Sequence, residues 1–270
     1  MTINKPGVYD LPIDDYHGQP CEGPSVSASG LRTILLDSPA HYWAESSLNP
    51  KAEKVDTLAL RIGKAAHSWV LGEPEFNRNF VVSPFEEFRT KEAKEWRDSQ
   101  TRVVLKAKDL DMVRDMADAL RAQPCVASAF TGHGMPEMSL IWQDEETGVW
   151  LKARPDWLPA DPAMYFAQEY KSAVSADPRK ASRQAFDLGY DIQAALAVDG
   201  IRATMGVEPL GIAHVVQEKT PPYAASLLMF SREQLEFGRR RYREALKRFA
   251  GCLARHHAGD PPAVAWPGYL

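Results

Sequence analysis

Apolar residues recur every three or four positions in four long stretches, a spacing that places them on one face of a helix. The helices predicted in this way cover residues 58–71, 106–122, 190–205 and 231–257. Ser231 and Gln234 form a capping box at the start of the last helix. Gly206 follows the third, and glycine commonly ends a helix. Shorter helices are predicted to begin at Ser27 or Ser29, at Pro39 and at Pro178.

Between the second and third long helices, the pattern changes to short aromatic-rich runs that are typical of β-strands. The expected strands begin at Glu137 and then cover residues 149–158 and 165–172. The run Asp-Glu-Glu-Thr-Gly at 144–148 is typical of a turn, so the first two strands are predicted to form a hairpin. Three more strands are predicted, the last two of them paired as a hairpin, at residues 76–83, 210–218 and 223–230.

The two ends of the chain show neither the helical spacing of apolar residues nor the short runs typical of strands. Residues 1–26 are rich in proline, glycine and aspartate and are predicted to form an extended arm with turns. Residues 27–270 are then expected to form a single domain, with a loop at 46–56 and an extended tail from 261 to 267. The segment 85–99 is charged and aromatic, and either it approaches DNA or it forms a solvated charged helix.

Composition is that of an ordinary globular protein and narrows the range of partners. Of 270 residues, 44% are hydrophobic and 25% are charged, and the net charge of −4 argues against a broadly basic protein that coats DNA. No run of about 18 apolar residues predicts a membrane span, and the N-terminus lacks the pattern of a secretory signal. Three scattered cysteines without a CxxC pair fit a reducing cytoplasm and exclude a four-cysteine iron–sulfur cluster within this chain.

The predicted strands carry acidic and basic side chains in a pattern that suits metal-dependent chemistry. Glu169 and Lys171 are two positions apart, so both side chains point to one face of their strand. If the preceding strand is its neighbour, Asp156 and Glu169 converge on one cation with the Lys171 ammonium beside them. Mg²⁺ prefers carboxylate oxygens, and a bound ion polarises a phosphoryl oxygen and lowers the pKa of water. The alternative is that these carboxylates are solvated strand residues.

Two further candidates come from neighbouring elements. His67 lies one helical turn after Gly63 and shares its face, and it is either a metal ligand or a partly buried core histidine. Glu137 begins the strand that the hairpin brings opposite Asp156. It is therefore either a further carboxylate of the site or a surface residue.

Basic residues concentrate in two places. Lys152 and Arg154 alternate with apolar neighbours, which predicts that they either contact phosphate or lie on a solvated face. The predicted helix 231–257 carries a crowded basic run, which is either a solvated face or a contact for DNA or another subunit. Its members are Arg239, Arg240, Arg241, Arg243, Lys247 and Arg248.

The order of short motifs over nearly the whole chain resembles a nuclease family. Pro155-Asp156 followed by Glu169-Tyr170-Lys171 resembles the PD-(D/E)xK signature, and Gly63 with His67 resembles the GxxxH element of its RecB-like branch. Gln193 resembles the start of the QxxxY element of that branch. Further matching pieces are Ser27-x-Ser29-x-Leu31, Ser38-Pro39-Ala40-x-Tyr42, Glu75-Phe76, Arg89-Thr90, Glu146-Thr147-Gly148 and Asp199-Gly200. Together they resemble the nuclease domain of RecE, or exonuclease VIII, and its phage-borne relatives.

This resemblance implies an α/β fold of the restriction-endonuclease type, in which a central mixed β-sheet is flanked by helices. It also implies that Asp156 and Glu169 hold Mg²⁺, for which Mn²⁺ can substitute, with His67 as a further ligand. The backbone carbonyl of Tyr170 and the carboxylate of Glu137 are additional candidate ligands.

In the same family pattern, Lys171 orients or activates the attacking water. Gln193 is expected in the first turn of its helix, where its amide either bonds a ligand or faces solvent. The second acidic position often holds Asp in the family, and the superfamily pattern allows the Glu169 found here. Ala197 stands where the family tends to have tyrosine, so any contact of that tyrosine with DNA or water is missing.

The implied activity is Mg²⁺-dependent digestion of double-stranded DNA from its ends, 5′ to 3′, which leaves a 3′ single strand for recombination by strand annealing. The family also implies a ring-shaped homo-oligomer, with a tetramer favoured, a RecT-like annealing partner, and a location in the cytoplasm of a bacterial host. Two alternatives stay open. One is a RecB-like nuclease of other polarity, such as an endonuclease or a single-strand exonuclease. The other is a non-catalytic DNA-binding or assembly protein on the same fold.

Overall fold

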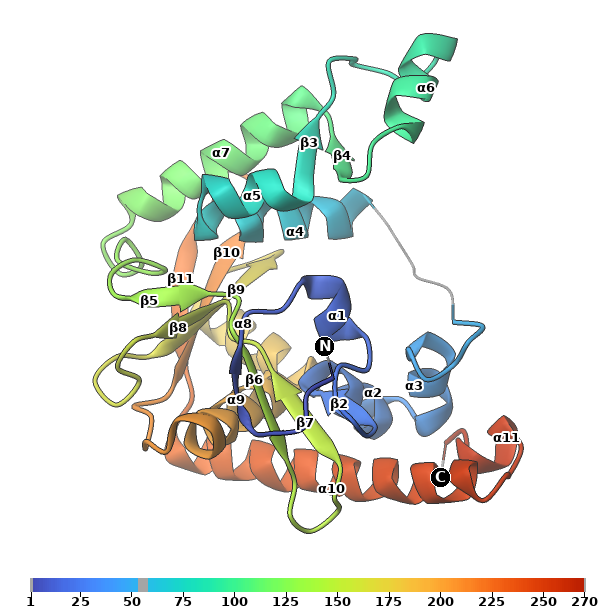
Figure 1. Ribbon diagram of the computed structural model, residues 1–270. Helices are drawn as coiled ribbons and strands as arrows, with labels where there is room; N and C mark the ends of the chain where they lie inside the picture. The colour runs from blue at the N-terminus through green and yellow to red at the C-terminus, as the bar shows by residue number, and fades with distance from the viewer. Residues whose placement is uncertain (1, 53–57, 270) are drawn as a thin grey trace.

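Two mixed β-sheets form the centre of the fold, and helices pack around them (Figure 1). The computed structural model describes residues 2–52 and 58–269. The first sheet has the order β1 (Gly7–Tyr9), β6 (Ser139–Gln143), β7 (Trp150–Ala153), β2 (Ser25–Ser27). The second has the order β11 (Ala225–Met229), β10 (Ile212–Glu218), β9 (Ala167–Ala173), β8 (Trp157–Pro159), β5 (Gly134–Pro136). The predicted α/β class with mixed sheets and flanking helices is thus confirmed.

The helices connect and cover these sheets. They are α1 (Ile13–His17), α2 (Ala28–Leu36), α3 (Pro39–Glu45), α4 (Leu58–Leu71), α5 (Glu73–Asn79), α6 (Lys91–Asp98), α7 (Ala107–Ala122), α8 (Pro178–Asp187), α9 (Tyr190–Met205), α10 (Arg232–His257) and α11 (Pro262–Ala265). A small parallel pair, β3 (Phe80–Val82) and β4 (Val103–Leu105), lies between α5 and α7 in sequence. Within the described ranges, no helix combines the length and the apolar character needed to span a lipid bilayer.

The elements with clear periodicity lie where the sequence predicts them. The four long helices are confirmed as α4, α7, α9 and α10. Both hairpins are confirmed, because β6 pairs antiparallel with β7 and β10 pairs antiparallel with β11. Ser231 and Gln234 form the capping box of α10, and Gly206 ends α9 in the left-handed conformation. Local spacing and capping chemistry therefore suffice for these elements.

One predicted strand is broken in two, and the break shapes the site. The sequence predicts a single strand over 149–158, but the chain forms β7 and β8, which belong to different sheets. Pro155 lies between them and has no backbone N–H, so the hydrogen-bonded ladder cannot continue through it. Asp156 therefore stands where the chain crosses from one sheet to the other.

The N-terminal segment, predicted as an extended arm, is built into the first sheet. Strand β1 pairs with β6, and β2 pairs with β7. Two smaller differences concern local structure: α5 occupies the start of the strand predicted at 76–83, and α11 replaces part of the tail predicted as extended. The loop predicted at 46–56 falls partly outside the described residues, from 53 to 57.

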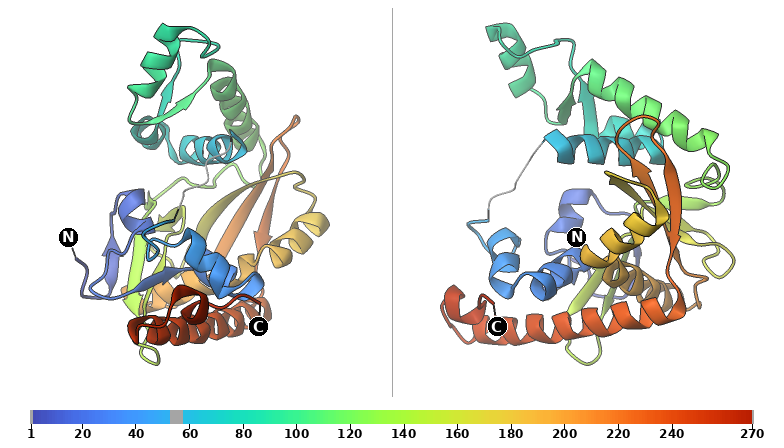
Figure 2. Two further views of the ribbon diagram at one scale, coloured as in Figure 1. Left: turned by 90° about the vertical axis from the view of Figure 1, so that its right-hand side faces the viewer. Right: turned by 180° about the vertical axis from the view of Figure 1, so that it is seen from behind.

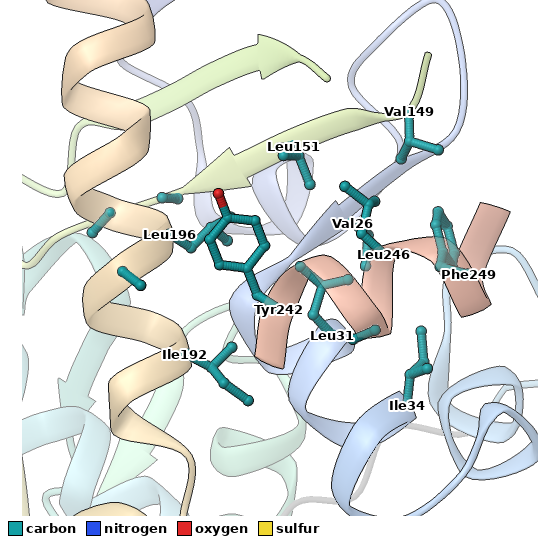
Figure 3. Close-up of a cluster of buried hydrophobic side chains, with 14 of the residues drawn as sticks. Val26, Leu31, Ile34, Val149, Leu151, Ile192, Leu196, Tyr242, Leu246 and Phe249 are labelled. Atoms are coloured by element: carbon teal, nitrogen blue, oxygen red, sulfur yellow. The ribbon is translucent and has the colours of Figure 1, made fainter. Parts of the chain in front are cut away.

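Two hydrophobic clusters hold the sheets between the helices. The larger one joins α2, α9 and α10 to β2 and β7 (Figure 3), and it includes Val26, Leu31, Ile34, Leu151, Ile192, Leu196, Tyr242, Leu246 and Phe249. The smaller one packs α4, α5 and α7 against Tyr170 of β9 and Val215 of β10. Because Tyr170 faces this smaller cluster, its neighbours Glu169 and Lys171 face the opposite side of the sheet.

The basic run on α10 is largely engaged within the protein. Arg239 bonds Asp199 and Arg241 bonds Asp191, which both lie on α9. Arg243 pairs with Asp144 and with Glu146 at the turn between β6 and β7. The expectation of a solvated or DNA-contacting face is therefore wrong for these three arginines, because each is partly buried against an acidic partner far away in sequence.

Close packing between α9 and α10 generates a stability prediction. A methyl group at Gly238 would lie 2.1 Å from the Asp191 carbonyl oxygen, whereas one at Gly251 on the same helix would meet nothing within 4 Å. We expect Gly238→Ala to lower the free energy of unfolding by about 1–3 kcal/mol through overpacking. Gly251→Ala should raise it by up to about 1 kcal/mol, because alanine favours helix. Chemical denaturation of both variants measures this, and an equal effect of the two substitutions would contradict it.

Candidate metal centre and active site

Three side chains from separate elements converge at the end of β7. The Nε2 atom of His67, on α4, lies 2.9 Å from Oδ1 of Asp156 and 3.2 Å from Oε1 of Glu137. The potential ligand atoms of these three residues all lie within 4.8 Å of one another. His67 Nε2 is buried, and no acceptor meets it with hydrogen-bond geometry among the described residues.

The backbone fixes the two carboxylates of this group. Oδ2 of Asp156 accepts a hydrogen bond of 2.6 Å from the N–H of Tyr170, which ties it to β9. Glu137 lies between β5 and β6 with φ at 57°, in the left-handed region that non-glycine residues seldom occupy. Its N–H donates to the Asp156 carbonyl at 3.1 Å, and its carboxylate accepts from the Arg154 guanidinium. The local backbone strain at Glu137 is thus offset by contacts that aim its carboxylate at His67.

Glu169 and Lys171 form a second pair beside this group. As predicted for positions two apart on a strand, they share a face of β9, and Nζ of Lys171 lies 3.0 Å from Oε2 of Glu169. Glu169 is only 2% exposed. The Lys171 ammonium also lies 5.3 Å from the centre of the Tyr190 ring at the start of α9. Glu169 is not a member of the close group formed by His67, Glu137 and Asp156.

The charges of the site shift the proton affinities of its members. Burial disfavours the charged imidazole, but Asp156 and then Glu137 outweigh it and raise the pKa of His67 to about 9. Burial, reinforced by the charge of Asp156, raises the pKa of Glu169. For Asp156 the effect of burial is overcome by His67 and Lys171, so its pKa is lowered. The site therefore attracts positive charge, which a bound proton on His67 can supply.

The donor set fits a divalent cation. Buried carboxylates clustered without a compensating charge are costly, and a cation between them removes that cost. His67 Nε2 faces two carboxylate oxygens without a fitting hydrogen bond, as expected of a nitrogen that lends its lone pair to a metal. The hard oxygens suit Mg²⁺ or Mn²⁺, and the imidazole is better suited to Mn²⁺.

The remaining predicted residues lie on neighbouring elements. Gln193 is half-buried in the first turn of α9, one turn after Tyr190, and its side chain makes no hydrogen bond within the described part of the chain. Ala197 is buried in the larger hydrophobic cluster. Tyr170 stacks its ring on His67 with 6.4 Å between ring centres, and its N–H donates to Asp156.

Lys152 and Arg154 are not on a solvated face. Lys152 is 3% exposed and donates to the carbonyl oxygens of Tyr16 and Gly18, each at 2.6 Å. Arg154 donates to the Leu11 carbonyl at 2.8 Å, in addition to Glu137. Their alternation with apolar residues suggested an exposed strand face, but the N-terminal segment covers it. Arg154 therefore orients Glu137 from within the protein, where its side chain is only 7% exposed.

Sequence reasoning also missed His214. It is fully buried on β10, in register with Glu169, and packs between the rings of Tyr190 and Phe230. Neither ring nitrogen has a partner among the described residues. Burial, with the Lys171 charge, holds the pKa of His214 well below its usual range, so the ring is neutral. No motif marks it, because its strand reads as an ordinary apolar run.

Comparison with known proteins agrees with this fold. A crystal structure of a protein from Eubacterium rectale, provisionally named an exonuclease, has the same fold with a TM-score of 0.65, at 15% identity and covering 94% of this chain and 88% of that one. No curated protein sequence matches the chain. Residues 27–261 match the model of the PDDEXK-like domain of unknown function, DUF3799. That match spans most of the chain, so the protein belongs to the PDDEXK-like DUF3799 family within the PD-(D/E)xK nuclease superfamily.

Proposed function

We propose that this protein is a Mg²⁺-dependent exonuclease that hydrolyses phosphodiester bonds at the ends of double-stranded DNA. The observation that carries the proposal is the convergence of Asp156, His67 and Glu137 beside the Glu169–Lys171 pair. Carboxylates and a lysine brought together in a buried site suit phosphoryl chemistry, because they hold a cation and offset charge in the transition state. The name of the Eubacterium rectale protein supports the exonuclease class.

Each residue of the site has a distinct part in the proposed reaction. Asp156, His67 and Glu137 would hold the ion, with Glu169 as a further carboxylate. When bound, the ion would polarise a phosphoryl oxygen and lower the pKa of a water molecule. Arg154 and the Tyr170 N–H keep Glu137 and Asp156 in place. Lys171 would donate a hydrogen bond from Nζ to the attacking water or to a phosphate oxygen, while Glu169 keeps Nζ protonated.

Removing charge at the centre of the site should abolish cleavage without unfolding the protein. We expect Lys171→Met and Asp156→Asn each to reduce single-turnover cleavage of linear duplex DNA by about 100-fold or more. Lys108→Met, which removes an exposed lysine on α7, should leave the rate unchanged. Circular dichroism would verify that all three variants fold, and full activity of either site variant would rule out the proposed chemistry.

Metal binding can be tested without DNA. Titration calorimetry with Mn²⁺ should show an affinity that increases with pH below about 9, because His67 must lose its proton before Nε2 can bind the ion. His67→Ala should weaken binding by roughly tenfold or more and flatten this pH dependence. The matched control is His257→Ala, which removes an exposed histidine at the end of α10. Equal binding by the two variants would exclude His67 as a ligand.

The polarity proposed from the RecE-like motifs needs a separate experiment. A linear duplex labelled at one 5′ end should lose its label early in the presence of Mg²⁺ and stay intact in EDTA, whereas a covalently closed circle should not be cut. Cutting of the circle would still support metal-dependent cleavage but would identify the protein as an endonuclease. Binding without cleavage under either metal would favour the non-catalytic alternative.

A further inference from the structure

Helix α8 carries three cations that the fold does not neutralise. Arg179, Lys180 and Arg183 are exposed, and none forms an ion pair or a side-chain hydrogen bond within the described part of the chain. Asp177 caps the helix by accepting from the backbone N–H groups of Arg179 and Lys180, so its carboxylate is occupied by the backbone. The three cations are therefore available to a ligand.

The state of these cations differs from that of the α10 arginines. Arg239, Arg241 and Arg243 are all held by carboxylates and serve to dock α10 on its neighbours. With a net charge of −4, the chain has more acidic than basic side chains, so acidic partners for these cations are not lacking in its composition. Three unpaired cations on one short helix are thus not explained by the packing of the fold.

The position of α8 links these cations to the proposed active site. Ala173 lies two residues after Lys171 on β9 and so faces the same side of the sheet. Ala181 of α8 packs in one cluster with Ala173 and with Val216 of β10. The helix therefore packs on the face of the sheet that carries Glu169 and Lys171. Its contact at Ala173 is two strand residues, or roughly 7 Å, beyond Lys171 along β9. Figure 2 shows α8 beside the end of β9.

Helical geometry directs the cations outward from this contact. The buried residues Ala181 and Ala185 are four positions apart and define the face that rests on the sheet. Arg179 and Arg183 are also four apart, and they lie on the opposite, solvent-facing side of the helix. Lys180 lies beside them. The result is a cationic ridge on the outer side of the helix that packs against the catalytic face.

We propose that the ridge formed by Arg179, Lys180 and Arg183 binds the phosphate backbone of the DNA next to the bond that is cut. This inference rests on the proposed function and adds to it the surface that holds the substrate. Duplex DNA carries one charge per about 1.7 Å of its axis, so phosphates lie within a few nucleotides of any bond held at Lys171. The contact is to phosphates and carries no sequence preference.

The test is a triple substitution, Arg179→Gln, Lys180→Gln and Arg183→Gln, which keeps helix-forming side chains and removes the charge. Fluorescence anisotropy in EDTA would measure binding to a labelled duplex and to a labelled single strand. We expect affinity to fall by about tenfold or more and the slope of log K against log salt to fall by about 2 to 3 in magnitude. Cleavage in Mg²⁺ at saturating DNA should stay within about twofold of the original rate, because the loss lies in binding.

A matched control removes the same charge elsewhere. Lys247→Gln, Arg248→Gln and Arg255→Gln change three cations in the C-terminal half of α10, which lies along the bottom of Figure 2, away from α8. This variant should bind DNA as the original protein does. If both triple variants lose affinity equally, net charge explains the effect and the ridge does not, which overturns the proposal.

The outcomes also separate this inference from the proposed function. If the unmodified protein cleaves DNA but the α8 variant binds both probes with unchanged affinity, the ridge is excluded as a DNA-binding surface and the proposed nuclease activity is retained. Loss on the duplex alone, or on the single strand alone, supports the ridge and identifies the form of DNA that it holds. If the unmodified protein neither binds nor cleaves DNA, the proposed function itself fails.

Discussion

The arrangement of the site depends on how the charge of Asp156 is satisfied. A buried carboxylate without partners costs several kcal/mol, so the groups around it must come together for the chain to fold as it does. The partners are the N–H of Tyr170 on β9 and the imidazole of His67 on α4. Because Asp156 itself lies where the chain leaves the first sheet for the second, this one carboxylate links both sheets to the layer formed by α4, α5 and α7.

Buried or partly buried cations elsewhere in the molecule are also held by specific partners. Arg154 aims Glu137 toward His67, and Lys152 holds the N-terminal segment on the first sheet through two carbonyl oxygens. Arg239, Arg241 and Arg243 of α10 reach acids on α9 and on the β6–β7 turn, so these three stabilise packing. Arg179, Lys180 and Arg183 make no such pair within the described part of the chain, and they lie on a helix that packs against the catalytic face.

Much of the candidate site could be inferred from spacing alone. The two-residue interval between Glu169 and Lys171 puts them on one face of a strand, and the helix that carries His67 has the predicted bounds. The grouping of these residues could not be inferred, because it depends on where α4 and the two sheets cross. The sequence favoured Asp156 with Glu169 as the metal pair, whereas the structure groups Asp156 most closely with His67 and Glu137 and leaves Glu169 against Lys171.

By itself, the sequence determined the long helices and both hairpins, because periodicity and capping act between residues close together in the chain. It predicted one strand where the structure forms β7 and β8 on either side of Pro155. The tertiary structure alone decided which polar side chains are buried. Lys152 and Arg154 alternate with apolar residues, a pattern typical of a strand with one solvent-exposed face. Only the packing of residues 11–18 over that face buries them. Arg241 pairs with an acid 50 positions away, and Arg243 with one 99 positions away. Burial and ion pairing of this kind depend on neighbours in space, which local patterns do not encode.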